Sequence, residues 1–410
     1  VMSRDTSGAL SIIQNITNRH MLSNRMVDGL AGASSIFLSY DRTSLYVTGY
    51  TDQSLVMFNR DPDKGLLEYV DRIKNGERQF EKFVVSIDVS EKTKVPNSND
   101  EYPRQLDSEA SRKAKYFNVD GKQYLVIAVD ISLNVNAPTP EENSYIDVLI
   151  WNHEERSFNR VHRKIIQHGA VDIESTYVVD DDGKGAHYLM VSFFENTAVW
   201  YPALQEAAGV KVYRWNSAKQ ELVFHHQLPQ LHPDGEAMFG TSMVPSGMHA
   251  FLIGKQRFLA VAYHKSARTA SDSKGNSIQL TYKVPSYIYI WNSDGQRLME
   301  DGVLVSGFGF EAFQRIVSIG ATEFTHLPTP CTEDHAHALG SQCVDGCVHF
   351  LAMSAFGSES DHHVSSMVWR FQPNSGNFDP DNRGLWNNVG TPGYFEKVFD
   401  GSSSAKRATA

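Results

Sequence analysis

The chain has 410 residues, of which 41% are hydrophobic, so it can bury a large core. Its formal net charge of −10 provides no cationic field to hold a phosphate backbone, and we expect no nucleic-acid partner. No apolar run reaches the roughly 20 residues that a spanning helix needs, so we expect no membrane span.

The first expected strand is the alternating run at 8–14, which should pair with a partner elsewhere in the chain. The region 29–73 then contains four short strands, expected at 33–39, 45–49, 54–58 and 66–70. The turn at 61–65 has a proline and a glycine where a tight reversal needs them. Four short antiparallel strands in about 45 residues are typical of one propeller blade.

Four further units follow after a long charged excursion at 74–114. Each unit has the same succession of short β-rich runs separated by turns. Their strands are expected at 115–119, 124–129, 146–151 and 158–165; at 174–179, 188–193, 210–215 and 221–228; at 248–253, 258–263, 287–291 and 297–305; and at 313–319, 348–354 and 367–371.

Two sequence patterns recur in fixed order in all five units. An apolar or aromatic residue leads the second strand, and an aromatic residue followed by an amide ends the third strand, at Phe58, Trp151, Trp215, Trp291 and Phe371. Such repetition indicates a repeat architecture. Because the register of the tryptophans recurs, we interpret them as packing residues.

We therefore predict an all-β propeller of four-stranded blades, with five blades favoured and six or seven as alternatives. Radial closure would cover the open edges and faces that a single blade leaves. We expect the strand at 8–16 to complete the last blade, whose fourth strand near 377–380 is interrupted by proline. The propeller should form one domain, 1–400, followed by a disordered tail, 401–410.

The connection between the second and third strands is longer in the last four units than in the first. Loops of one class emerge on one rim of a closed ring, where binding usually resides. The rim candidates are Asp52, Asp130, Glu195, His264, Lys265 and His362, with Asp361 and His363 beside the last. They could bind a divalent metal or serve as acid and base. The alternative is that they are simply solvated.

The first strands of the blades should line an axial channel. Its candidate residues are Glu174, His249 and Glu311, which could hold a divalent ion or a substrate, or only ordered water. This ion is the one cofactor that we consider. No nucleophile elbow, phosphate loop, zinc-protease motif or dinucleotide fingerprint is present.

The three cysteines, Cys331, Cys343 and Cys347, all fall within one short window. We favour a local disulfide with one spare thiol, which is typical of an oxidising compartment. The alternative is a zinc site that includes Asp334, His335 and His337, although the spacing matches no standard zinc motif.

Parts of the sequence resemble two families. The segments 8–14, 27–35, 45–50 and 56–61 resemble a repeat of the lactonase-type propellers. Tyr124-Leu-Val, Tyr188-Leu-Met-Val, Phe258-Leu-Ala-Val and the Tyr-x-Trp-Asn endings at 213–216 and 289–292 resemble the EAR (EPTP) repeats of secreted propeller proteins. The EAR resemblance implies a ligand- or receptor-binding module at or outside the cell surface. The lactonase resemblance implies a hydrolase, but none of its catalytic residues can be matched here.

We favour a secreted or surface-associated protein that binds a protein or glycan ligand through its rim. The alternative is an enzyme, a lactonase-like hydrolase or a metal-dependent lyase, that uses the histidines and carboxylates of the rim or channel. A third hypothesis is a structural subunit of a larger assembly.

Overall fold

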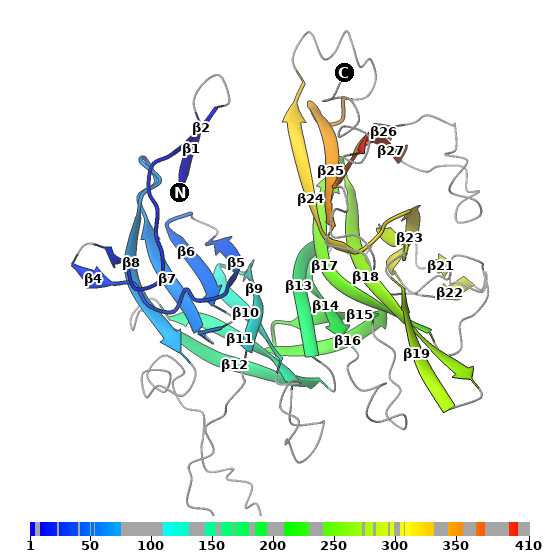
Figure 1. Cartoon of the computed structure of the whole chain (residues 1–410), viewed down its shortest axis with the longest axis horizontal. Coiled ribbons are helices and arrows are strands. Elements are labelled where there is room, and N and C mark those ends of the chain that lie inside the picture. The colour runs from blue at the N-terminus through cyan, green and yellow to red at the C-terminus, as the bar shows by residue number, and fades with distance from the viewer. Residues whose placement is uncertain are drawn as a thin grey trace, which may run out of the picture. The chain divides into compact units, whose positions relative to one another are not determined.

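The protein consists of β-strands and their connections throughout the part of the chain that the structure describes, with no helix there (Figure 1). The structure is a computed structural model. No described segment forms a helix with the length and apolar character needed to cross a membrane. The described residues are 1–4, 9–22, 24–39, 42–49, 51–52, 54–74, 110–130, 144–152, 157–166, 169–179, 185–194, 209–228, 241–272, 275–281, 284–293, 296–298, 304–306, 308–331, 343–355, 366–373 and 393–400.

Five sheets follow one another along the chain, and each has four strands that are hydrogen-bonded in chain order. The first contains β5 (Ala33–Leu38), β6 (Ser44–Gly49), β7 (Ser54–Arg60) and β8 (Leu67–Lys74). The second contains β9 (Ala110–Val119), β10 (Lys122–Asp130), β11 (Ser144–Asn152) and β12 (Ser157–Ile166). The third contains β13 (Gly169–Val179), β14 (Gly185–Phe194), β15 (Gly209–Asn216) and β16 (Glu221–Gln227). The fourth contains β17 (Thr241–Ile253), β18 (Gln256–Asp272), β20 (Ser286–Asn292) and β23 (Gly309–Ile316), and the fifth β24 (Ala321–Pro330), β25 (Cys347–Ala355), β26 (Met367–Pro373) and β27 (Gly393–Asp400).

Five consecutive four-stranded meanders confirm the predicted fold class, a five-bladed β-propeller. Four small additions accompany the sheets. Strand β19 (Gly275–Thr281) extends the fourth sheet by pairing with β18. Three two-stranded hairpins are formed by β1 (Met2–Arg4) with β2 (Leu10–Ile12), by β3 (Met21–Leu22) with β4 (Arg25–Met26), and by β21 (Gln296–Leu298) with β22 (Leu304–Ser306).

In the third, fourth and fifth sheets, the recurring aromatic residue of the third strand packs on the second strand of the preceding sheet. The ring centroids of Trp215 and Tyr124 are 5.2 Å apart, and those of Trp291 and Tyr188 are 4.5 Å apart. Phe371 and Phe258 form the corresponding pair at 6.0 Å. Each such pair adds about 0.5–1.5 kcal/mol to the stabilisation from burial alone. The two sequence patterns thus encode a contact between consecutive blades.

Three expected strand positions are wrong. The run at 297–305 is not the fourth strand of the fourth sheet, because it falls in the β21–β22 hairpin. That place is taken by β23, which pairs with β20, so the run expected to begin the fifth sheet belongs to the fourth. The fifth sheet begins instead with β24 and is completed by β27. The strand at 8–16, expected to complete the last sheet, pairs with β1 instead in its described part.

The chain divides into two compact units. We call Val1–Ser175 with Trp215–Val223 the N-terminal unit, and Thr176–Arg214 with Phe224–Ala410 the C-terminal unit. The core of the C-terminal unit includes fully buried Tyr263, Tyr287 and Tyr289. The cores of the N-terminal unit are smaller and centre on Leu125 and Val56.

Candidate functional site

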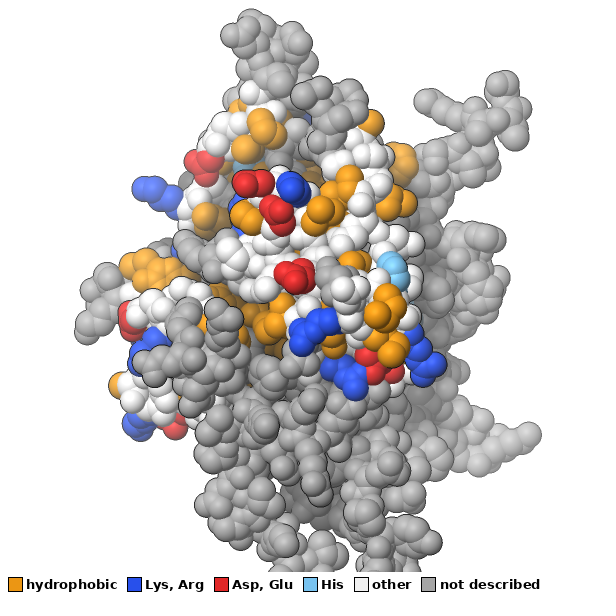
Figure 2. Space-filling model, turned by 90° about the vertical axis from the view of Figure 1, so that its left-hand side faces the viewer, with side chains coloured by type: hydrophobic (Ala, Val, Ile, Leu, Met, Phe, Trp, Pro, Cys, Tyr) orange, Lys and Arg blue, Asp and Glu red, His pale blue; other side chains and the backbone are white. Residues whose placement is uncertain are grey.

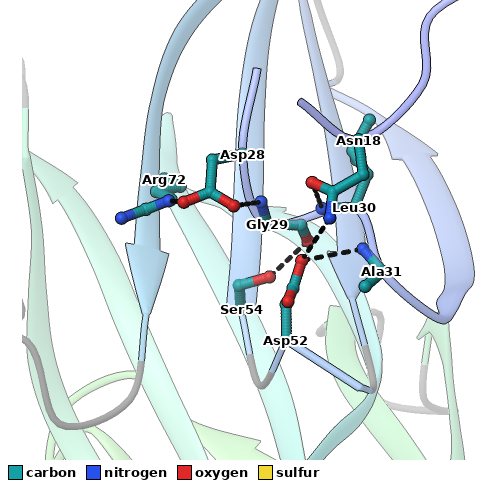
Figure 3. A network of polar contacts seen from close by, with 8 residues as sticks. All are labelled: Asn18, Asp28, Gly29, Leu30, Ala31, Asp52, Ser54 and Arg72. Atoms are coloured by element: carbon teal, nitrogen blue, oxygen red, sulfur yellow. Dashed lines mark hydrogen bonds and ion pairs between the residues drawn. The ribbon is translucent and has the colours of Figure 1, made fainter. Parts of the chain in front are cut away.

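Asp52, expected on the ligand-binding rim, belongs to a polar network of the first sheet (Figure 3). Its Oδ2 atom accepts a hydrogen bond from the backbone N–H of Ala31 at 2.8 Å and another from Nδ2 of Asn18 at 3.1 Å. The side-chain oxygen of Asn18 in turn accepts the N–H of Leu30 at 3.1 Å. Asp52 therefore holds the segment 28–31 beside the turn between β6 and β7.

The neighbouring residues complete this network. The carboxylate of Asp28 accepts the N–H of Gly29 at 2.9 Å and forms an ion pair with Arg72. Gly29 has φ of 100°, a conformation that favours glycine, and its carbonyl accepts a hydrogen bond from the hydroxyl of Ser54. Oδ2 of Asp52 is thus engaged within the protein, and the role of Asp52 on a ligand-binding rim stays a prediction.

Three other rim candidates lie in strands. Asp130 is the last residue of β10, where it pairs with Ser144 of β11. His264 and Lys265 do not start a loop as expected, because β18 continues through both and pairs with β19 further on. The register shift against β17 falls at His264, with Tyr263 and Lys265 paired on either side, so His264 occupies a β-bulge. Glu195, Asp361, His362 and His363 lie outside the described residues.

Glu174 lies on the first strand of the third sheet, where it was expected to line the channel. It is 6% exposed, and its Oε1 accepts a hydrogen bond from Nζ of Lys115 on β9 at 2.7 Å. Asp172, 2% exposed, lies 3.7 Å from Nζ of Lys113. Residues two apart share one face of a strand. These four residues, the charge ladder, therefore join the first strands of two consecutive sheets with two ion pairs.

Glu311 is not on a first strand, which corrects its assignment to the channel. It lies on β23, the fourth strand of the fourth sheet, opposite Ile290 of β20, and is 3% exposed. The error follows from assigning this run to the next sheet, one strand position too late.

His249 does lie on a first strand, β17, and belongs to a group of rings that the sequence did not predict. Its ring stacks on Phe251 at 6.1 Å, and Phe251 stacks on His326 of β24 at 4.6 Å. His326 Nε2 lies 2.9 Å from Nδ1 of His349 on β25. Burial, followed by the charges of His349 and His249, lowers the pKa of His326 to about 4. No spacing pattern connects these histidines. Pairing of β24 with β25 brings His326 to His349, and contact between β17 and β24 of different sheets brings His249 near them.

Cys331 and Cys343 form a disulfide, and Cys347 is a free thiol. This is the arrangement that we favoured over a zinc site. Asp334, His335 and His337, the other residues of the zinc alternative, lie outside the described residues. Within the described residues, no three His, Cys, Asp or Glu side chains come together as a metal-binding group.

A pocket of about 390 Å³ opens in the N-terminal unit between the N-terminal segment and the first sheet. This volume falls within the range of ligand pockets, about 300–1,000 Å³. Its walls are mainly apolar, with Asn15 and Arg60 as the polar side chains. The apolar side chains are Val1, Ile16, Leu30, Ala33, Ile36, Leu38, Leu45, Val47, Phe58 and Leu67.

The pocket has a buried floor and an exposed mouth. Val47 and Phe58 are buried, whereas Ile36 is 68% and Leu38 41% exposed. Figure 2, which views the side where the first sheet lies in Figure 1, shows hydrophobic side chains at the surface among charged ones. The guanidinium of Arg60 donates a hydrogen bond from Nη1 to the carbonyl of Arg42 at 3.3 Å. The pocket can therefore take an apolar group with a hydrogen-bond acceptor or an anion at its edge.

No protein-family model matches the sequence, and no curated protein matches it. Among solved structures, the chain is similar to the periplasmic gluconolactonase of Pseudomonas aeruginosa, with 12% identity and a TM-score of 0.42 over 92% of this chain and 76% of that one. It is similar to the alpha-L-arabinanase of Cellvibrio cellulosa complexed with arabinohexaose, with 10% identity and a TM-score of 0.37 over 90% and 96% of the two chains.

It is also similar to the xylan beta-1,4-xylosidase of Bacillus halodurans, with 10% identity and a TM-score of 0.38 over 92% of this chain and 56% of that one. Similarity of this degree identifies neither a family nor an activity. The EAR character of the repeats, which no family model matches, stays a prediction.

Proposed function

We propose that this chain is a propeller that binds a protein ligand, at the cell surface or outside the cell, and that the pocket of the first sheet takes an apolar side chain of that ligand. The pocket is the observation that carries the proposal. Its apolar walls favour a protein over a glycan, whose hydroxyls would lose hydrogen bonds to water there. Arg60 at the wall favours an acidic group beside the apolar side chain.

Two further observations support a binding protein of this kind. The disulfide between Cys331 and Cys343 suits an oxidising compartment, which is the basis for the location. The connection between the second and third strands of the fourth sheet, one of those expected to form the rim, contains a two-stranded extension of β18 and β19. Extensions of this kind on a repeat scaffold are common places for binding.

The capacity of the pocket can be measured with the probe 1-anilinonaphthalene-8-sulfonate, which has apolar rings and one anionic group. We expect saturable binding that is weakened at least fivefold by Ile36→Asp, which puts a charge into the pocket mouth. Ile12→Asp is the matched control, because Ile12 is 70% exposed, comparable to 68% for Ile36, and does not line the pocket. Arg60→Gln should weaken the anionic probe more than an uncharged naphthalene.

The same variants then separate the two kinds of ligand on arrays of immobilised extracellular proteins and glycans. The proposal requires protein signals that Ile36→Asp removes and Ile12→Asp leaves in place. Binding to glycans alone, or protein binding that both variants leave unchanged, would contradict it.

A hydrolase is the second candidate, and the charge ladder is the observation that favours it. Asp172 and Glu174 are buried carboxylates on one strand face, and each has a lysine beside it. Such groups can exchange protons with a substrate during acid–base catalysis. Turnover of lactones or aryl glycosides by the purified protein, abolished by Asp172→Asn or Glu174→Gln but unaffected by Ile36→Asp, would establish the enzyme instead of the binding protein.

A further inference from the structure

The described part of the C-terminal unit contains two pairs of histidines in contact, and the pairs differ in where their hydrogens lie. In the first pair, Nε2 of His349 lies 3.1 Å from the carbonyl oxygen of Val344. A carbonyl only accepts hydrogen bonds, so Nε2 of His349 carries a hydrogen and its Nδ1 has a lone pair. That lone pair points to Nε2 of His326 at 2.9 Å.

In the second pair, Nε2 of His226 accepts the backbone N–H of Phe310 at 3.2 Å. Its hydrogen therefore lies on Nδ1, which is 2.6 Å from Nδ1 of His225. A cation between these two rings would have to displace that hydrogen to Nε2 and leave the buried N–H of Phe310 without its acceptor. The loss of such a hydrogen bond in a buried place is unfavourable.

We propose that His326 and His349 form a binding site for a divalent transition-metal cation such as Zn²⁺ or Ni²⁺, which replaces the hydrogen between Nε2 of His326 and Nδ1 of His349. The hydrogen of His326 moves to its own Nδ1, so both rings stay neutral and no proton leaves the site. Imidazole nitrogens bind zinc at about 2.0–2.1 Å, which at a tetrahedral angle places two of them about 3.3–3.4 Å apart. The two nitrogens, now 2.9 Å apart on nearly parallel rings, must therefore separate and the rings must tilt toward the metal.

The surroundings resemble those of a metal-binding histidine. A ligating imidazole usually donates its other N–H to a carbonyl or carboxylate, which fixes the ring and its tautomer. His349 makes this bond to Val344 and is 5% exposed. Phe251 stacks on His326 and restricts the second ring.

The coordination by protein side chains would be incomplete. His326 and His349 provide two nitrogens, and no metal-binding group of three or more side chains is present among the described residues. Water would fill the other positions, which are those that a ligand or substrate could reach.

The test is titration of the metal-free full-length chain with Zn²⁺ and with Ni²⁺, by calorimetry and by competition with a chelator of known affinity. His326→Gln and His349→Gln keep an N–H near the position of Nε2 but remove the ligating nitrogen. His225→Gln is the matched control in the second pair. We expect one equivalent of metal on the wild type and on His225→Gln, and at least tenfold weaker binding by the other two variants.

X-ray absorption of the zinc-loaded wild type should show two imidazole ligands, and zinc should raise the Tm of the wild type and of His225→Gln only, since metal that binds the folded state stabilises it. The Tm measurement without metal shows whether each variant is folded. If His349→Gln is not folded, the metal affinity of His326→Gln, at the more exposed position, decides the test. Equal affinity of all four proteins, absence of binding to the wild type, or an equal loss in His225→Gln would overturn the proposal.

Discussion

Two glutamines make the same pair of hydrogen bonds in the two units, in very different surroundings. In the N-terminal unit, Nε2 of Gln14 donates to the carbonyl of Leu67, and the N–H of Leu67 donates to Oε1 of Gln14, both at 2.8 Å. In the C-terminal unit, Gln314 of β23 makes the same two bonds to Phe395 of β27, both at 2.7 Å. In each case a side-chain amide makes the two hydrogen bonds to a strand residue that a neighbouring strand would otherwise make.

The difference between the two pairs is burial. Gln314 is 4% exposed and Phe395 fully buried, so their polar groups have no access to water. Gln14 is half-buried, and its partner Leu67 lines the pocket of the first sheet. Equal hydrogen-bond geometry therefore does not mean equal stabilisation, because water can replace one pair and not the other.

The largest expected effect comes from breaking the buried pair. Gln314→Met keeps the shape of the side chain but leaves the N–H and C=O of Phe395 unpaired. Since an unsatisfied buried polar group costs about 1–3 kcal/mol, we expect the free energy of unfolding to fall by about 2–4 kcal/mol. Urea denaturation followed by fluorescence measures it. A fall below about 1 kcal/mol would mean that burial does not separate the two pairs.

The same substitution at the half-buried pair should cost less. For Gln14→Met we expect a loss of about 1 kcal/mol or less, because water reaches the freed groups of Leu67. Because Gln14 ties the N-terminal segment to a pocket residue, the variant should also bind 1-anilinonaphthalene-8-sulfonate more weakly. Unfolding and probe titration are measured on one preparation. An effect as large as that of Gln314→Met would refute the comparison.

The smallest expected effect is on the pH dependence of the free energy of unfolding. The two glutamine pairs do not contribute to it, because amides do not titrate. Burial, followed by the charge of Lys164, lowers the pKa of His162 in the N-terminal unit. Its pKa is then lower in the folded than in the unfolded state, so the unfolded chain binds more protons as the pH falls below the ordinary histidine value. Stability should thus be full above about pH 6.5 and decline below it.

The variant His162→Gln should reduce the slope of this decline, measured by urea denaturation at a series of pH values. The difference between Gln14→Met and the wild type should stay constant across the same series. An unchanged slope in His162→Gln would assign the pH dependence to other groups.

The candidate site was less predictable than the strands. Asp52 was expected on the ligand-binding rim because it follows a strand, and no local pattern predicts that its Oδ2 contacts Asn18 and Ala31. Glu174 was placed on the correct strand, but its partner Lys115 comes from another sheet. The pocket depends on how the N-terminal segment lies against β5 and β6, which no local pattern encodes.

The sequence by itself determined the alternation of strands and turns and the aromatic residues at Trp215, Trp291 and Phe371, because these depend on period and on a contact that recurs from the second sheet to the fifth. Only the tertiary structure decided that β23 belongs to the fourth sheet and that His326 meets His349. Those outcomes depend on which strands pair, and several β-rich runs of similar composition compete for each pairing.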